Sequence, residues 1–131
     1  MSRSSKKIIL LTNKFLEKVR RQLLIPNCCY RLGAFGRVQK CKQRKTGKQC
    51  VVKVVDKLVL NDQERIRLKY EVDILKNLNH PNIVQLYEVY ESMSSMYIVT
   101  ELCEGVELFD EIVKPKRFNE QSAANVIKQM L

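Results

Sequence analysis

The sequence places a glycine-containing turn, a lysine-bearing strand and a glutamate-bearing helix in one fixed order, and this order constrains the fold most. Gly33 and Gly36 flank the turn, Lys53 follows within a run of valines, and Glu71 comes eighteen residues after that lysine. Each piece alone is common, because glycines occur in ordinary hairpin turns and many strands contain lysine. The combination predicts a turn whose backbone N–H groups cover phosphates, a lysine that contacts them, and a carboxylate that orients the lysine.

The length and composition predict one globular domain that stays inside the cell. A chain of 131 residues can bury enough apolar surface to fold alone, and 45% of its residues are hydrophobic. The apolar run from Ile8 to Leu11 is too short to cross a bilayer or to form the core of a secretory signal. We therefore expect a cytoplasmic protein.

The cysteines predict packing rather than a disulfide framework or a metal site. Their number, five, is odd, and no Cys-x-x-Cys pair occurs among them. The single histidine, His80, has no partners at zinc-ligand spacing. We expect reduced thiols that serve mostly as packing residues, and no metal ligands in this chain.

The positive charge is concentrated in the first part of the chain. Residues 1–53 hold fifteen Lys or Arg and one acid, Glu17, whereas residues 54–131 hold nine basic and thirteen acidic residues. Anionic partners therefore suit the N-terminal region. Aromatic residues do not alternate with the basic ones, so we expect no nucleic-acid partner.

Residues 6–25 repeat apolar side chains at steps of three or four, which is the period of a helix, and Pro26 ends the pattern. The apolar positions are Ile8, Leu11, Phe15, Val19 and Leu23. Three interpretations remain open: an amphipathic helix resting on the following domain, a basic helix that binds a calmodulin-like protein or an anionic membrane, and an organellar presequence.

The chain from residue 30 to residue 55 is typical of short strands separated by tight turns. We expect strands at Arg31–Leu32, Val38–Lys42 and Gln49–Val55. Thr46-Gly47 predicts a hairpin between the last two, because glycine adopts a positive φ without steric penalty.

A helix is predicted over Asn61–Leu78, capped by Asn61 or Asp62. Its apolar residues at helical spacing are Ile66, Tyr70, Ile74, Leu75 and Leu78. Two more strands, Ile83–Tyr90 and Met96–Thr100, and two more helices, Leu108–Val113 and Asn119–Leu131, follow, with Asn119 as the cap of the last helix.

Six short motifs follow one another in this chain. They are the glycine turn, the Lys53 strand, the Glu71 helix, His80-Pro81-Asn82-Ile83, Tyr97-Ile98-Val99-Thr100-Glu101 and Glu107-Leu108-Phe109-Asp110. No motif is specific alone, but their order and spacing from Tyr30 to Leu131 resemble the N-terminal lobe of a eukaryotic serine/threonine protein kinase. The last motif, with Lys116-Arg117-Phe118-Asn119-Glu120, is most similar to the calcium-dependent and calmodulin-dependent group.

The resemblance implies an α+β fold, in which a twisted five-stranded antiparallel sheet carries one main helix and is followed by the first short helices of a second lobe. It also implies an N-lobe with its hinge (29–105) and the start of the C-lobe (106–131), which follow the basic amphipathic extension (1–28) described above.

The resemblance further implies ATP as the ligand. Lys53 would contact the α- and β-phosphates, and Glu71 would hold its ammonium group in place. An ordinary ion pair between Lys53 and Glu71 is the alternative.

By the same resemblance, the adenine ring would lie in the sheet's pocket. Thr100 would stand at the back of that pocket, the Glu101 carbonyl and Cys103 amide would hydrogen-bond adenine, and Glu107 would reach the ribose. The residues expected to sandwich the ring are Leu32, Val38 and Val51.

The sequence departs from the family pattern at three places. The turn Leu32-Gly33-Ala34-Phe35-Gly36 keeps two glycines and is two residues shorter, Val51 stands where the family usually has alanine, and Val106 replaces the second of two glycines before Glu107. Together these changes predict weakened nucleotide binding.

The His-Arg-Asp and Asp-Phe-Gly motifs, which supply the base and the Mg²⁺ site in the family, do not occur in these 131 residues. We expect ATP γ-phosphate transfer to protein Ser/Thr, with Mg²⁺, from an intact enzyme and not from this chain alone. The alternative is a non-catalytic kinase remnant that binds a protein partner or an anionic surface. The last predicted helix has an apolar stripe that the missing lobe or self-association would cover: Ala123, Val126, Ile127, Met130 and Leu131.

Overall fold

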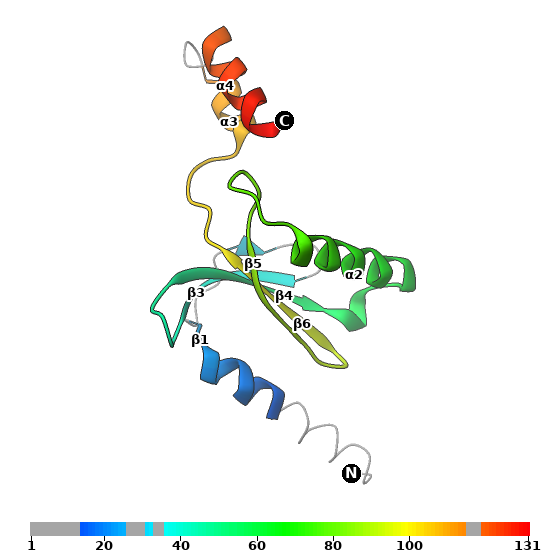
Figure 1. Cartoon of the computed structure of the whole chain (residues 1–131). Helices are drawn as coiled ribbons and strands as arrows, with labels where there is room; N and C mark the ends of the chain where they lie inside the picture. The colour runs from blue at the N-terminus through cyan, green and yellow to red at the C-terminus, as the bar shows by residue number, and fades with distance from the viewer. Residues whose placement is uncertain (1–13, 26–30, 33–35, 115–118) are drawn as a thin grey trace.

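The computed structural model describes residues 14–25, 31–32, 36–114 and 119–131 as an antiparallel sheet with helices on both faces (Figure 1). The strands are β1 (Leu23–Leu24), β2 (Arg31–Leu32), β3 (Gly36–Gln43), β4 (Gln49–Asp56), β5 (Leu86–Glu91) and β6 (Ser95–Glu101). The helices are the N-terminal helix (residues 14–22), a short turn η1 (Lys57–Val59), α2 (Asp62–Asn77), α3 (Leu108–Ile112) and α4 (Glu120–Met130).

The strand order is β1-β3-β4-β6-β5, and β2 also pairs with β3. Strands β2 to β6 form the predicted five-stranded antiparallel sheet. The two-residue β1 was not predicted, because the helical period continues through Leu23 to Ile25. In the structure the N-terminal helix ends at residue 22, and Leu23 and Leu24 instead pair with Gln43 and Lys42.

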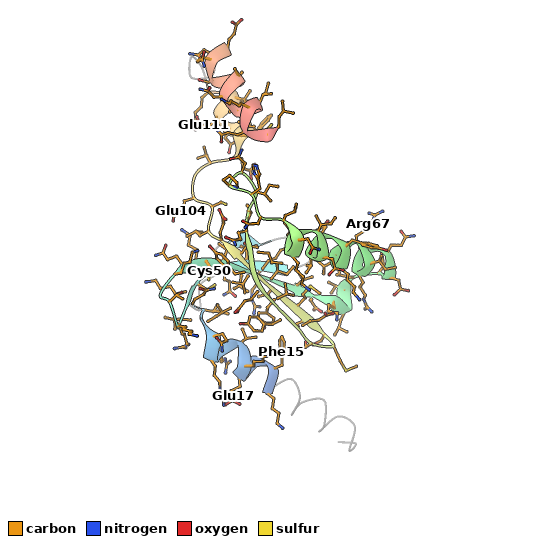
Figure 2. All side chains as sticks on the ribbon, in the orientation of Figure 1. Phe15, Glu17, Cys50, Arg67, Glu104 and Glu111 are labelled. Carbon is orange, nitrogen blue, oxygen red and sulfur yellow. The ribbon has the colours of Figure 1, made fainter. Side chains whose placement is uncertain are left out.

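The outer face of the sheet is the face that carries Val52, Val54 and Val99, and the N-terminal helix covers it. Val19 of this helix and Leu23 of β1 are 2% and 1% exposed and belong to the same core cluster as those valines. The ring of Phe15 meets the ring of Tyr97 edge to face at 5.5 Å between centroids (Figure 2). The amphipathic helix resting on the following domain is therefore confirmed for residues 14–22, while residues 6–13 lie outside the described part.

Hydrogen bonds fix this helix to the hairpin between β3 and β4. The backbone N–H of Arg44 donates to the carbonyl of Gln22 at 2.9 Å, and its Nε donates to the carbonyl of Arg20 at 2.7 Å. These bonds satisfy carbonyls near the helix's C-terminal end that have no partner within the helix. Within the hairpin, Gly47 adopts φ 70°, as the Thr46-Gly47 signal predicted.

The inner face of the sheet is the face that carries Val55, Met96 and Ile98, and α2 covers it through Leu68 and Val72. The predicted cap of α2 is confirmed: Asn61 Oδ1 accepts from the N–H of Glu64, and Glu64 Oε2 accepts from the N–H of Asn61. This reciprocal capping box satisfies two donors at the start of the helix.

The apolar stripe expected on α2 is not its buried face. Ile66, Tyr70 and Ile74 are 54%, 66% and 58% exposed, whereas Val72 is 4% exposed. The helix carries two apolar stripes, and the one that contains Leu68 and Val72 packs against the sheet. Helical period alone does not distinguish the two stripes.

The segment after α2 enters the sheet later than predicted. Ile83 donates its N–H to the carbonyl of His80, which places it in a turn, so β5 begins at Leu86.

Beyond β6, an extended connector leads to α3 and α4, which stand away from the sheet (Figure 1). Asn119 caps α4 as predicted, because its Oδ1 accepts from the N–H of Ser122 at 2.9 Å. The end of its apolar stripe is open, since Ile127 is 54% and Met130 68% exposed.

We predict that Leu23→Ala lowers the free energy of unfolding by about 2–5 kcal/mol, because it removes a buried side chain that joins the N-terminal helix to the sheet. Leu24→Ala is the matched control, since Leu24 is the next residue of the same strand and is 50% exposed. It should change stability by less than about 1 kcal/mol. Urea denaturation compares the two variants. Equal losses would contradict the packing of this helix on the sheet.

Candidate functional site

The sheet brings four of the predicted site residues to its inner face. Val51 and Lys53 lie two positions apart on β4, so their side chains share one face. Val38 on β3 is the register partner of Lys53, and Thr100 on β6 is the register partner of Val51. Val38, Val51 and Thr100 are all half-buried. An apolar strip therefore lies beside a lysine ammonium on the face opposite the N-terminal helix.

Lys53 and Glu71 line one pocket between the sheet and α2. Its volume is about 420 Å³, and its walls come from β4, the start of α2 and the segment before it. The lining residues are Lys53, Val55, Leu60, Glu64, Arg67, Leu68 and Glu71. The fold thus places the predicted lysine and carboxylate at one site, although eighteen residues separate them in sequence.

The two side chains share the pocket without a direct ion pair. Among the described residues, Lys53 and Glu71 do not approach within the 4.0 Å that would define a salt bridge between them. Both residues are exposed, so water competes with any attraction between them. The alternative of a plain structural ion pair is not what this structure contains.

Arg67 and Glu64 are members of this pocket that the sequence analysis missed. Arg67 lies on α2 (Figure 2). It comes four residues before Glu71, so the two share a helix face, and this spacing could have predicted its place in the pocket. Glu64 is already engaged in the capping box. The pocket is therefore lined by two cationic and two carboxylate side chains.

The connector after β6 begins at Glu101, which two hydrogen bonds fix to Gln85. Glu101 donates its N–H to the carbonyl of Gln85 at 2.9 Å, and its Oε2 accepts from the N–H of Gln85 at 3.0 Å. Cys103, two residues on, is an exposed free thiol. Glu104 forms a 3.2 Å ion pair with Lys40 of β3, which ties the connector to the sheet.

Three other predicted site residues are Glu107, Leu32 and Gly33. Glu107 is the N-cap residue of α3, and its carbonyl accepts from the N–H of Glu111. Leu32 lies on β2 and pairs through its backbone with Arg37. Gly33 falls outside the described residues, so the shortened turn is not seen.

The packing of two strands requires glycine at position 36. It begins β3 opposite Val55, and a Cβ atom at this position would overlap the carbonyl oxygen of Val54. Glycine is therefore required for the close approach of β3 and β4, whether or not a ligand lies beneath it.

Two further findings concern ions and membranes. In the ranges that the structure describes, no three His, Cys, Asp or Glu side chains gather closely enough to hold a metal ion. Within the same ranges, no helix combines the length and the apolar character that a membrane span requires.

The arrangement suits a ligand with a flat apolar part and an anionic part. The half-buried strip of Val38, Val51 and Thr100 can contact a ring, and Lys53 can contact an anion at its end. The residue types present therefore suit a nucleotide, and Glu71 lines the same pocket as Lys53.

Comparison with known proteins places this geometry in a family. Residues 32–131 match the protein kinase domain. Calcium-dependent protein kinase 5 of Plasmodium berghei (strain Anka) is 44% identical over 124 residues, which are 93% of this chain and 21% of that protein. That span exceeds the kinase match, so the likeness includes much of the segment before residue 32. Myosin light chain kinase A of Dictyostelium discoideum is 40% identical over 99 residues, which are 76% of this chain and 34% of that protein.

Among solved structures, the crystal structure of Rad53 1–466 in complex with AMP-PNP is similar with a TM-score of 0.69 and 29% identity. The likeness covers 86% of this chain and 29% of that one. The chain thus spans about a fifth to a third of the length of these relatives. The five-stranded antiparallel sheet with its main helix is the N-lobe of a protein kinase, and the chain belongs to the protein kinase domain family.

Proposed function

We propose that this chain is the ATP-binding N-terminal part of a serine/threonine protein kinase of the calcium-dependent type. The observation that carries the proposal is the shared pocket of Lys53 and Glu71, bordered by the apolar strip on the inner face. Adenine would lie against Val38 and Val51, with Thr100 at the back. Its hydrogen bonds would go to the Glu101 carbonyl and the Cys103 amide.

Lys53 would contact the α- and β-phosphates, and Gly36 together with Gly33 would let the backbone approach them. Glu107 would reach the ribose, and Leu32 would cover the adenine. Phosphoryl transfer depends mainly on position and charge neutralisation, so a lysine held correctly matters more than one that is merely nearby. Because Lys53 and Glu71 form no ion pair in this structure, the proposal requires the two side chains to approach each other when nucleotide binds.

The whole protein would transfer the ATP γ-phosphate to Ser or Thr of a protein substrate, with Mg²⁺ supplying neutralisation of the phosphate charge. Its Mg²⁺ ligands and base would come from motifs that are not in these 131 residues. Transfer by this chain alone is therefore not expected. The rival function is a non-catalytic lobe that binds a partner.

We predict that Mg-ATP raises the melting temperature of this chain by several degrees, because a ligand at about 100 times its dissociation constant stabilises the folded state by about 2.7 kcal/mol. Lys53→Ala should abolish the shift by removing the cation beneath the phosphates. Lys69→Ala is the matched control, since Lys69 is an exposed lysine of α2 that does not line the pocket. A scanning fluorimetry titration measures all three proteins.

A second ligand sharpens this experiment. An inhibitor directed at the connector should stabilise both the original chain and Lys53→Ala, because its contacts are to backbone rather than to the lysine. If neither ligand raises the melting temperature, the proposal of nucleotide binding is contradicted and the non-catalytic lobe is favoured. An ATP shift that Lys53→Ala retains would contradict the role of this lysine.

A second candidate function, contact with an anionic membrane surface, is favoured by the exposed side of the N-terminal helix. Lys14, Lys18 and Arg21 are exposed, while Phe15 and Val19 pack on the sheet. A calmodulin-like partner would need those apolar side chains as anchors, so it would have to pull the helix off the sheet. An anionic surface needs only the charges, and we propose that it is the partner of this side.

We predict that a variant with Lys14→Glu, Lys18→Glu and Arg21→Glu binds phosphatidylserine vesicles at least 100-fold more weakly than the original chain, since each basic residue near such a surface contributes about 1 kcal/mol. The matched variant changes Lys69 and Lys76 of α2 to Glu. Co-sedimentation with anionic and neutral vesicles is the measurement. Equal loss in both variants, or equal binding to neutral vesicles, would contradict the proposal.

A further inference from the structure

Two thiols face each other on the outer face of the sheet, away from the pocket of Lys53 and Glu71. Cys41 of β3 and Cys50 of β4 are register partners, and their Sγ atoms lie 3.0 Å apart. Both are buried, at 4% and 0% exposure, within the core cluster that the N-terminal helix covers (Figure 2). Their separation of nine positions in the sequence did not indicate this pairing.

The backbone geometry at this pair suits a disulfide. The N–H of Gln43 donates to the carbonyl of Lys48, which makes that facing pair a hydrogen-bonded one, and Cys41 and Cys50 are the next hydrogen-bonded pair along the ladder. Cα atoms in such pairs are about 5.5 Å apart, which lies within the range of about 4.4–6.8 Å seen across disulfides. The strands therefore need no change of register to link the sulfurs.

A pocket borders this pair of thiols. Cys41 is one of the residues that line a pocket of about 320 Å³, whose other walls include Lys40, Leu102 and Glu104. A molecule of the size of hydrogen peroxide fits within that volume. Cys50 donates its Sγ–H toward the Cys41 carbonyl at 3.6 Å.

We propose that Cys41 and Cys50 are a reversible dithiol–disulfide site in the core of this lobe. Peroxide would transfer one oxygen to Cys41, giving a sulfenic acid and releasing water. Cys50 would then attack the Cys41 sulfur and displace a second water molecule, so that two thiols and one peroxide give one disulfide and two waters. Because Cys50 is held next to Cys41, disulfide formation is faster than further oxidation of the sulfenic acid.

Burial sets the resting state of the pair. Burial and the neighbouring Cys50 raise the pKa of the Cys41 thiol well above its usual value, so its thiolate is scarce and oxidation of the resting pair is slow. Once formed, the bond would close a loop of about ten residues and tie β3, which carries Val38, to β4, which carries Lys53.

The test compares two variants that each keep two thiols. One carries Cys28→Ser, Cys29→Ser and Cys103→Ser and retains Cys41 with Cys50. The other carries Cys28→Ser, Cys29→Ser and Cys41→Ala and retains Cys50 with Cys103. Each is treated with hydrogen peroxide, quenched with N-ethylmaleimide in denaturant, and measured by intact mass and peptide mapping.

We expect the first variant to lose both free thiols and two hydrogen atoms in mass, with a Cys41–Cys50 linked peptide that dithiothreitol reverses. The second should form an internal disulfide at least tenfold more slowly. Retention of both thiols in the first variant, or conversion of its thiols to sulfinic acid without a link, would overturn the proposal. If Cys41→Ala proves unstable by thermal melting, Cys50→Ala replaces it as the control.

Discussion

Strand β4 contributes buried side chains to both faces of the sheet, and the rest of the structure depends on that constraint. It lies between β3 and β6, and alternate side chains point to opposite sides: Cys50, Val52 and Val54 outward, Val51, Lys53 and Val55 inward. A strand buried on both faces needs two covers. The N-terminal helix covers the outer face and α2 covers the inner face. Lys53 is the charged residue in this run, so the fold places its ammonium group at the rim of the inner pocket, where α2 supplies acids.

This division between faces also separates the proposed activities. Nucleotide would bind on the inner face, where a shift of α2 changes the distance between Glu71 and Lys53. The basic surface lies on the exposed side of the N-terminal helix, beyond the outer core. The thiol pair lies between these two surfaces, in the layer that joins β3 to β4.

Much of the fold could be predicted because its signals are local. The side chains of Asn61 and Asn119 cap α2 and α4, so these residues predict where the helices start, and Thr46-Gly47 predicts the hairpin. Features that depend on distant partners could not be predicted. Leu23 continues a helical period, yet pairing with Gln43 makes it a strand. Two apolar stripes run along α2, and only contact with the sheet selects the one with Val72. At the candidate site, the order of the motifs predicted that Lys53 and Glu71 lie together. Arg67 is not part of those motifs, and only its spacing of four residues from Glu71 on the helix indicates its place in the pocket.

The most direct measurement is a nuclear magnetic resonance titration of the ¹⁵N-labelled chain with Mg-ATP. A lobe whose inner face binds nucleotide predicts that the largest amide shifts occur at Val38, Val51, Lys53 and Cys103. The amides of Val19 and Leu23, beneath the outer face, should change little. The opposite distribution, with shifts concentrated in the N-terminal helix and none at Lys53 or Cys103, would contradict the assignment of the inner face as the nucleotide site.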